Sequence, residues 1–120
     1  MTGVHHLALR AESVLALAAF YVAVFRLDEL DRQTDELGVK SIWLGLGEAI
    51  LMIERRGPGE PAPDPTSREV QIFSGTKQDR LDVEQRLADA GFSPAFRSPY
   101  TTYLRDPEGR LTGISHYPER

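Results

Sequence analysis

The chain has no cysteine, which excludes a disulfide scaffold, a Cys-ligated zinc site and a thiol nucleophile. Only 3 of its 120 residues are histidine, and this small number limits metal chemistry. Positive charge is also scarce, with 14 Lys and Arg against 18 Asp and Glu, which disfavours a protein that wraps nucleic acid. No apolar run approaches the roughly 20 residues of a membrane helix, and the opening MTGVHH lacks the basic region of a signal peptide. We therefore expect one cytoplasmic domain without a membrane or nucleic-acid partner.

The first half of the chain alternates in the manner of strands around one apolar helix. In residues 3–10, Leu7 and Leu9 share one parity while His6 and Arg10 share the other, which predicts a half-buried strand. Residues 13–25 follow as a helix, with Ser13 as its N-cap and an apolar stripe at helical spacing. Residues 37–46 and 49–55 predict two strands joined by a hairpin. A further strand in this half is possible, but the pattern does not place it.

The stretch 57–67 contains four prolines and almost nothing apolar, so it predicts an exposed connector. The order of elements then repeats, with a strand at 69–74 and a helix from 76 to about 90. Thr76 and Asp79 have the spacing of a capping box, and Gly91 lies where a helix ends. Three short strands are predicted at 92–97, 100–105 and 110–117, with a turn at 106–109. The second half follows the first at an offset of roughly 65 residues, which indicates a duplication.

Several segments carry a resemblance to a known family. They are HLALR at 6–10, FY at 20–21 with VFRL at 24–27, YLRDPEG at 103–109 and SHYP at 115–118. Together they span nearly the whole chain and resemble the vicinal oxygen chelate superfamily. That superfamily includes glyoxalase I, extradiol dioxygenases, fosfomycin-resistance thiol transferases and bleomycin-resistance proteins. Arg26 departs from the family pattern, which usually has glycine at this position.

The resemblance implies an α+β fold of two βαβββ modules that form a curled mixed sheet around a cup, with the helices outside. We place module 1 at about 1–56, the linker at 57–67 and module 2 at about 68–120. In metal-using members of the family, four strand positions facing the cup hold the ligands. They are a His near the start of the first strand, a Glu ending module 1, a His or Gln opening module 2, and a Glu in the final strand.

Carried over one position at a time, these ligands fall on His6, Met52, Val70 and Gly113. The thioether of methionine is a soft ligand that does not serve hard cations, and valine and glycine have no side-chain donor. We therefore expect no metal ion and no other cofactor. The alternative is a divalent metal in a rearranged site, which would need a shift of register to bring in Glu69 or the use of Glu54.

The same alternation predicts what lines the cup: mostly apolar side chains with a few polar tips. His6 is either a polar group that contacts a ligand or an ordinary strand residue, and we expect His116 near the exposed end of the last strand. We leave the facing of Trp43 open. The candidate ligand-binding residues are His6, Arg10, Trp43, Met52, Val70, Ile72, Tyr103, Gly113 and Ser115.

Three functions are compatible with these residues. The first is a metal-free protein that binds a small, largely apolar molecule in the cup. The second is an enzyme of the superfamily (a lyase, isomerase, thiol transferase or dioxygenase) in which His6 acts as base or ligand. The third is an interaction domain whose cup is filled by its own side chains. The resemblance and the apolar first helix also favour a homodimer.

Overall fold

The computed structural model describes residues 1–120, which form two compact units, Met1–Ala62 and Pro63–Arg120. We call them unit 1 and unit 2; the boundary lies within the proline-rich stretch 57–67. Each unit contains one helix and one four-stranded mixed sheet. The element order is strand, helix and three strands in both units, which confirms the predicted α+β class with two βαβββ modules.

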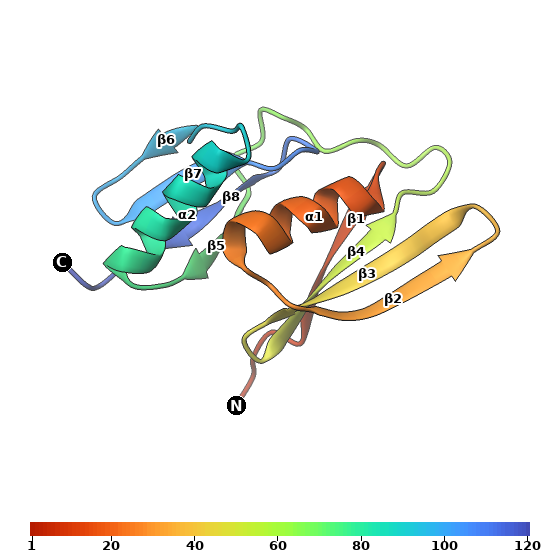
Figure 1. Cartoon of the computed structure of the whole chain (residues 1–120), viewed down its shortest axis with the longest axis horizontal. Helices are drawn as coiled ribbons and strands as arrows, with labels where there is room; N and C mark the ends of the chain where they lie inside the picture. The colour runs from red at the N-terminus through yellow and green to blue at the C-terminus, as the bar shows by residue number, and fades with distance from the viewer. The chain divides into compact units, whose positions relative to one another are not determined.

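Unit 1 consists of β1 (His6–Ala11), α1 (Val14–Phe25), β2 (Glu29–Asp35), β3 (Gly38–Leu46) and β4 (Ala49–Arg55). Its strands lie in the order β1-β4-β3-β2, with β1 parallel to β4 and the other neighbours antiparallel. Helix α1 lies across one face of this sheet (Figure 1) and contacts β1, β3 and β4. The opposite face of the sheet, which we call the open face of unit 1, carries no helix of its own unit.

Helix α1 begins where the sequence predicts. The Ser13 hydroxyl accepts a hydrogen bond from the Ala16 amide at 3.1 Å, which satisfies one of the amides that a helix start leaves unpaired. The inward stripe of Leu17, Phe20, Tyr21 and Val24 is buried as predicted. The helix contains no charged residue, and its outer side exposes further apolar side chains. Those most exposed are Leu15 and Val22.

Strand β2 is the element whose position the sequence pattern does not reveal. Every residue of β2 is exposed, so the strand has no apolar alternation to detect. It is an edge strand that pairs only with β3, and its side chains are mostly charged or polar. Charged side chains on an edge strand discourage pairing with another chain.

Unit 2 consists of β5 (Val70–Ser74), α2 (Lys77–Asp89), β6 (Phe96–Arg97), β7 (Thr101–Arg105) and β8 (Leu111–Ser115). Its strand order is β5-β8-β7-β6, with β5 parallel to β8. Helix α2 lies along one face and contacts β7 and β8 (Figure 1). The prediction of a strand over 92–97 is too long, since only Phe96 and Arg97 pair with β7.

The local signals of unit 2 are confirmed. The Thr76 amide donates to the Asp79 carboxylate at 2.8 Å, and the Asp79 amide donates to the Thr76 hydroxyl at 3.1 Å. This reciprocal pair is the predicted capping box. Gly91 follows α2 with a φ of 88°, a conformation that favours glycine. The predicted turn at 106–109 closes through a hydrogen bond from the Gly109 amide to the Asp106 carbonyl.

None of the helices combines the length and the apolar character that crossing a bilayer requires.

Candidate functional site

The open face of unit 1 is built from β1, β4 and β3. Residues paired across neighbouring strands point to the same side of a sheet, so the register defines three rows of side chains. The rows are His6–Ile50–Gly45, Ala8–Met52–Trp43 and Arg10–Glu54–Ser41. The intervening residues face α1 and form the core, including Leu9, Ile42, Leu44, Leu51 and Ile53. The register therefore settles the facing of Trp43, which shares a row with Met52.

The middle row gives this face its apolar character. Met52 and Trp43 of this row are half-buried and Ala8 is exposed, and Ile50 of the first row is also half-buried. Leu30 of β2 adds to the surface, because its Cδ2 lies 3.5 Å from the place that a Cβ on Gly45 would occupy. The aliphatic, thioether and indole groups form a continuous patch of the kind that lines small-molecule sites.

Two polar atoms of this face have no hydrogen-bond partner in the protein. They are Nε1 of Trp43 and Oγ of Ser41, both inaccessible to solvent, and Ser41 as a residue is only 1% exposed. The indole N–H can only donate, and buried polar groups nearly always have a partner. A bound molecule with an acceptor would supply the missing interaction if the side chains that cover Nε1 of Trp43 move aside.

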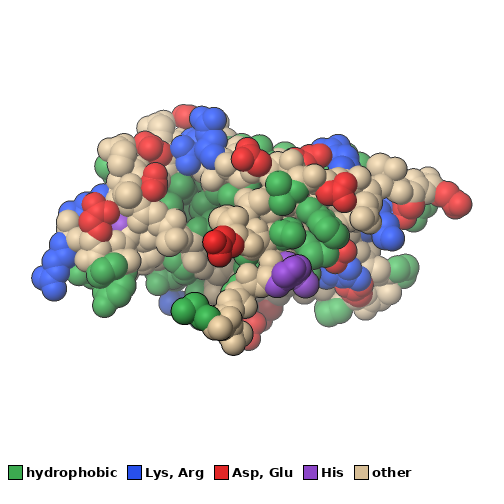
Figure 2. All heavy atoms as spheres, turned by 90° about the horizontal axis from the view of Figure 1, so that it is seen from below, with side chains coloured by type: hydrophobic (Ala, Val, Ile, Leu, Met, Phe, Trp, Pro, Cys, Tyr) green, Lys and Arg blue, Asp and Glu red, His purple; other side chains and the backbone are tan.

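His6 lies at the first row and pairs with its neighbour rather than with a carboxylate. Its Nδ1 is 2.9 Å from Nδ1 of His5, and the two rings meet edge to face at 5.2 Å. Both residues are exposed, and Figure 2 shows histidine side chains at the surface near hydrophobic ones. His6 is thus accessible to a ligand, and its ring bonds to His5 instead of to a carboxylate that would orient it as a catalytic base.

The four positions at which the superfamily holds a metal do not fit a metal ion in this chain. Only His6 offers a ligand; Met52 offers a thioether, and Val70 has no donor atom. At Gly113 the backbone leaves no space, because a Cβ would overlap the Thr102 carbonyl oxygen and lie 3.2 Å from Ile72. No group of three His, Asp or Glu side chains gathers elsewhere in either unit. Glu54, which the sequence offers as an alternative metal ligand in unit 1, forms an ion pair with Arg10 at 3.5 Å.

The third row leads into a charged cavity at the carboxyl ends of β1 and β4. Its volume is about 250 Å³. The residues lining it are Arg10, Asp35, Leu37, Lys40, Glu54, Arg55, Arg56, Gly57 and Pro58. Four are cationic and two are carboxylates, so the wall carries an excess of positive charge.

Two ion pairs organise this end of unit 1. Arg55 donates to both Asp35 oxygens at 2.6 and 2.8 Å, and Arg10 donates to both Glu60 oxygens at 2.7 and 3.0 Å. The hydrogen bonds from Arg55 lower the pKa of Asp35 to about 2, and those from Arg10 lower the pKa of Glu60 to about 2. Both carboxylates are therefore ionised at neutral pH, as paired carboxylates usually are.

The face of the unit-2 sheet opposite α2 carries the other predicted residues. One row is Ile72–Gly113–Tyr103–Phe96 and the next is Ser74–Ser115–Thr101. The rings of Tyr103 and Phe96 stack at 4.4 Å, and the Thr101 hydroxyl donates to the Ser115 hydroxyl at 2.9 Å. Val70 and Ile72 remain 42% and 36% exposed. The register thus brings Val70, Ile72, Tyr103, Gly113 and Ser115 onto one face of the unit-2 sheet.

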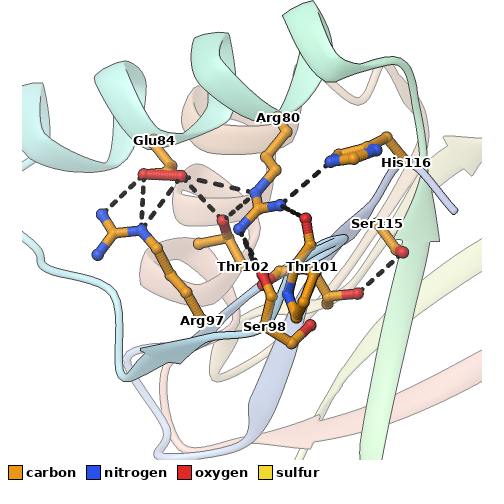
Figure 3. Close-up of polar contacts among 9 residues, drawn as sticks. Arg80, Glu84, Arg97, Ser98, Thr101, Thr102, Ser115 and His116 are labelled. Carbon is orange, nitrogen blue, oxygen red and sulfur yellow. Dashed lines mark hydrogen bonds and ion pairs between the residues drawn. The ribbon is translucent and has the colours of Figure 1, made fainter. Parts of the chain in front are cut away.

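His116 does not lie at an exposed strand end, so that expectation is wrong. It is 6% exposed and its Nε2 lies 3.2 Å from Nη1 of Arg80 (Figure 3). Arg80 extends from α2 and also donates to the Thr102 hydroxyl at 2.7 Å and to the Ser98 carbonyl at 3.0 Å. Glu84 joins the cluster by bonding with Arg97 at 2.7 Å. The cluster fixes α2 to β7, and its donors face other protein groups instead of a ligand.

The charged cavity is the part of the site that the sequence reasoning missed. Arg10 is predicted as a lining residue, but Arg55 and Lys40 of the cavity wall, and Glu60 that pairs with Arg10, are not. A signal was present in the chain: two arginines, Arg55 and Arg56, directly precede the turn former Gly-Pro-Gly. Such a turn can fold the chain back over the strand end that it leaves.

Comparisons with known proteins find similar structures but no similar sequence family. No protein-family model matches the chain, and no curated protein matches it. Among solved structures, a mutant of the fosfomycin resistance protein FosX from Listeria monocytogenes, complexed with Mn(II) and 1S,2S-dihydroxypropylphosphonic acid, aligns with a TM-score of 0.80. The two are 14% identical, over 96% of this chain and 92% of that one.

Two further structures align over almost their whole length. Lactoylglutathione lyase from Agrobacterium tumefaciens gives a TM-score of 0.70 at 21% identity, covering 98% of this chain and 95% of that one. A glyoxylase/bleomycin resistance protein/dioxygenase domain from Frankia sp. EAN1pec gives 0.74 at 21% identity, covering 97% and 98%. Likenesses of this extent show a shared fold.

Proposed function

We propose that this chain, which has the fold of the vicinal oxygen chelate superfamily, binds a small and largely apolar molecule without a metal ion. Its function would resemble that of the bleomycin-resistance proteins more than that of the metal-using enzymes. The binding surface is the open face of unit 1, centred on the row of Ala8, Met52 and Trp43.

One observation carries this proposal: the buried indole N–H of Trp43 has no partner in the protein, and Trp43 lies beside Met52 at the end of the apolar row. A ligand that covers Met52, displaces the groups over Nε1 of Trp43 and accepts from it would satisfy both the apolar and the polar groups. The metal-free part is supported by the residues at the four family positions, of which Met52, Val70 and Gly113 offer no ligand for a hard cation.

The experiment uses Trp43, the only tryptophan of the chain, as its reporter. The purified protein is titrated with N-phenyl-1-naphthylamine, a neutral apolar probe, while the Trp43 emission is recorded. We expect saturable quenching at one site. Placing a charge in the row, in Ala8→Lys, should weaken binding roughly tenfold or more, because the ammonium would be desolvated by the probe. Ala8 is exposed, so this variant does not disturb the core.

The matched control is Leu15→Lys, which adds the same charge to an exposed apolar residue of α1 in the same unit. It should leave the dissociation constant unchanged. Unsaturable quenching, or equal weakening in both variants, would refute binding at the open face. The metal-free part is tested by titrating Mn²⁺ and Zn²⁺ into the same sample, with dialysis and metal analysis as the readout. A stoichiometric ion retained by the wild type and lost in His6→Ala would overturn it.

A further inference from the structure

The guanidinium of Arg10 lies on the open face of unit 1, one row beyond the apolar row of Met52. It donates two hydrogen bonds to the carboxylate of Glu60, at 2.7 and 3.0 Å. Such a two-point contact is the arrangement by which arginine recognises a carboxylate, sulfonate or phosphonate group of a ligand. The Arg10 side chain remains 47% exposed in this pair, so the contact is reachable from solvent.

Glu60 is delivered to Arg10 by a tight turn. Pro58 and Gly59 occupy the centre of this turn, Gly59 has a φ of 82°, and the Glu60 amide donates to the Gly57 carbonyl at 3.1 Å. These are the features of a type II turn. The Glu60 carboxylate also accepts from the Gly57 amide at 3.0 Å, and a Cβ at Gly57 would lie 2.9 Å from it. The turn thus holds a carboxylate of the protein on Arg10.

The cavity next to Arg10 is lined by more cations than carboxylates. The adjoining cavity is walled by the cations of Arg10, Lys40, Arg55 and Arg56, against two carboxylates. When Glu60 on Arg10 and Glu12, which lies 3.6 Å from Arg56, are also counted, four cations face four carboxylates, so removing Glu60 from Arg10 leaves one unmatched positive charge for a ligand. A volume of about 250 Å³ is below the 300–1,000 Å³ common for whole ligands, and it suits one end group of a molecule whose body lies elsewhere.

We infer that the ligand of the open face is an apolar molecule carrying one acidic oxygen-rich group, and that this group binds Arg10 by displacing the Glu60 carboxylate. The inference rests on the proposed function and specifies its ligand class. The apolar body lies on the row of Met52, and the acidic group lies at the cavity. Glu60 acts as an internal competitor that lowers the affinity for acidic ligands and leaves neutral ones unaffected.

Two probes that share an aromatic body test this directly. 1-Anilinonaphthalene-8-sulfonate carries a sulfonate, and N-phenyl-1-naphthylamine lacks it. Glu60→Gln removes the competing charge but keeps an acceptor for the Gly57 amide. We expect this variant to bind the sulfonate probe about fivefold more tightly than the wild type, the size of an exposed ion pair. Its affinity for the neutral probe should not change.

The control is Glu48→Gln, which makes the same change of charge in unit 1 at the exposed β3–β4 turn. A double-mutant cycle with Arg10→Gln completes the test. The gain from Glu60→Gln should vanish when Arg10 is absent. An equal gain in Glu48→Gln, a gain that survives Arg10→Gln, or no gain would each overturn the inference. The proposed function is tested separately, by whether the neutral probe binds at all.

Discussion

Arg26 ends helix α1 in a conformation that arginine rarely adopts. Its φ is 60° and its ψ is 37°, in the left-handed region, and its amide donates to the Val22 carbonyl at 3.0 Å. This is the usual geometry of a helix C-terminus, where glycine is the common residue. Arg26 is exposed, and the left-handed backbone brings its Cβ close to the following carbonyl oxygen. We predict that Arg26→Gly stabilises the protein.

The magnitude follows from two opposing terms. Relief of the left-handed conformation contributes about 1–2 kcal/mol, and the greater freedom of glycine in the unfolded chain removes about 0.4–1 kcal/mol. The net gain is about 0.5–1 kcal/mol. With an unfolding entropy of about 2.1 cal/mol/K per residue for 120 residues, this gain raises Tm by about 2–4 °C.

Differential scanning calorimetry of the wild type, Arg26→Gly and Arg26→Ala measures this effect. Alanine removes the guanidinium but keeps the Cβ, so it should leave Tm close to that of the wild type. Gly91→Ala provides the opposite change at the end of α2, where glycine already has a φ of 88°, and should lower Tm. If Arg26→Gly and Arg26→Ala shift Tm equally, or if glycine lowers Tm, the backbone conformation is not what limits stability at this position.

Three further predictions concern packing, a polar cluster and acid stability. Gly113→Ala should destabilise the protein by about 2–3 kcal/mol, because the new Cβ meets the Thr102 carbonyl; urea unfolding measures this, and an unchanged midpoint would contradict it. Arg80→Met should cost about 3 kcal/mol by leaving buried partners unpaired; a loss below 1 kcal/mol in the same assay would contradict it. The stability from Asp35 and Glu60 is present above their ordinary pKa values of 3.8 and 4.5 and lost as the pH falls toward about 2. Glu60→Gln should therefore lose less unfolding free energy than the wild type between pH 5 and 2. Identical acid-unfolding profiles of the two proteins would argue against the Arg10–Glu60 pair.

The elements that sequence reasoning predicted well are those set by neighbouring residues. The Ser13 cap and the capping box of Thr76 and Asp79 each depend on spacings of three residues, and both are present. The inward and outward faces of β1 and β4 follow from alternation alone. The sequence alone could therefore assign which residues of each strand face the core, such as the buried Leu9, and which face away, such as the exposed Arg10.

The features that escaped prediction depend on partners distant in the sequence. Strand β2 is recognisable only through its pairing with β3, because its own side chains are all exposed. The facing of Trp43 required the register of β3 against β4. Glu60 lies 50 residues after Arg10, and no spacing rule links a turn residue to a strand residue so far away. The ligand-binding role of the nine candidate residues stays a prediction.

The absence of charge from α1 has a colloidal consequence. Its outer side presents Leu15 and Val22 to solvent with no charged neighbour in the helix, so the repulsion between copies comes from charges elsewhere in the chain. The sequence pI is about 5.3, and near that pH the long-range repulsion between molecules is weakest. Copies would then meet most readily through this uncharged stripe, and solutions kept well above that pH would resist self-association best.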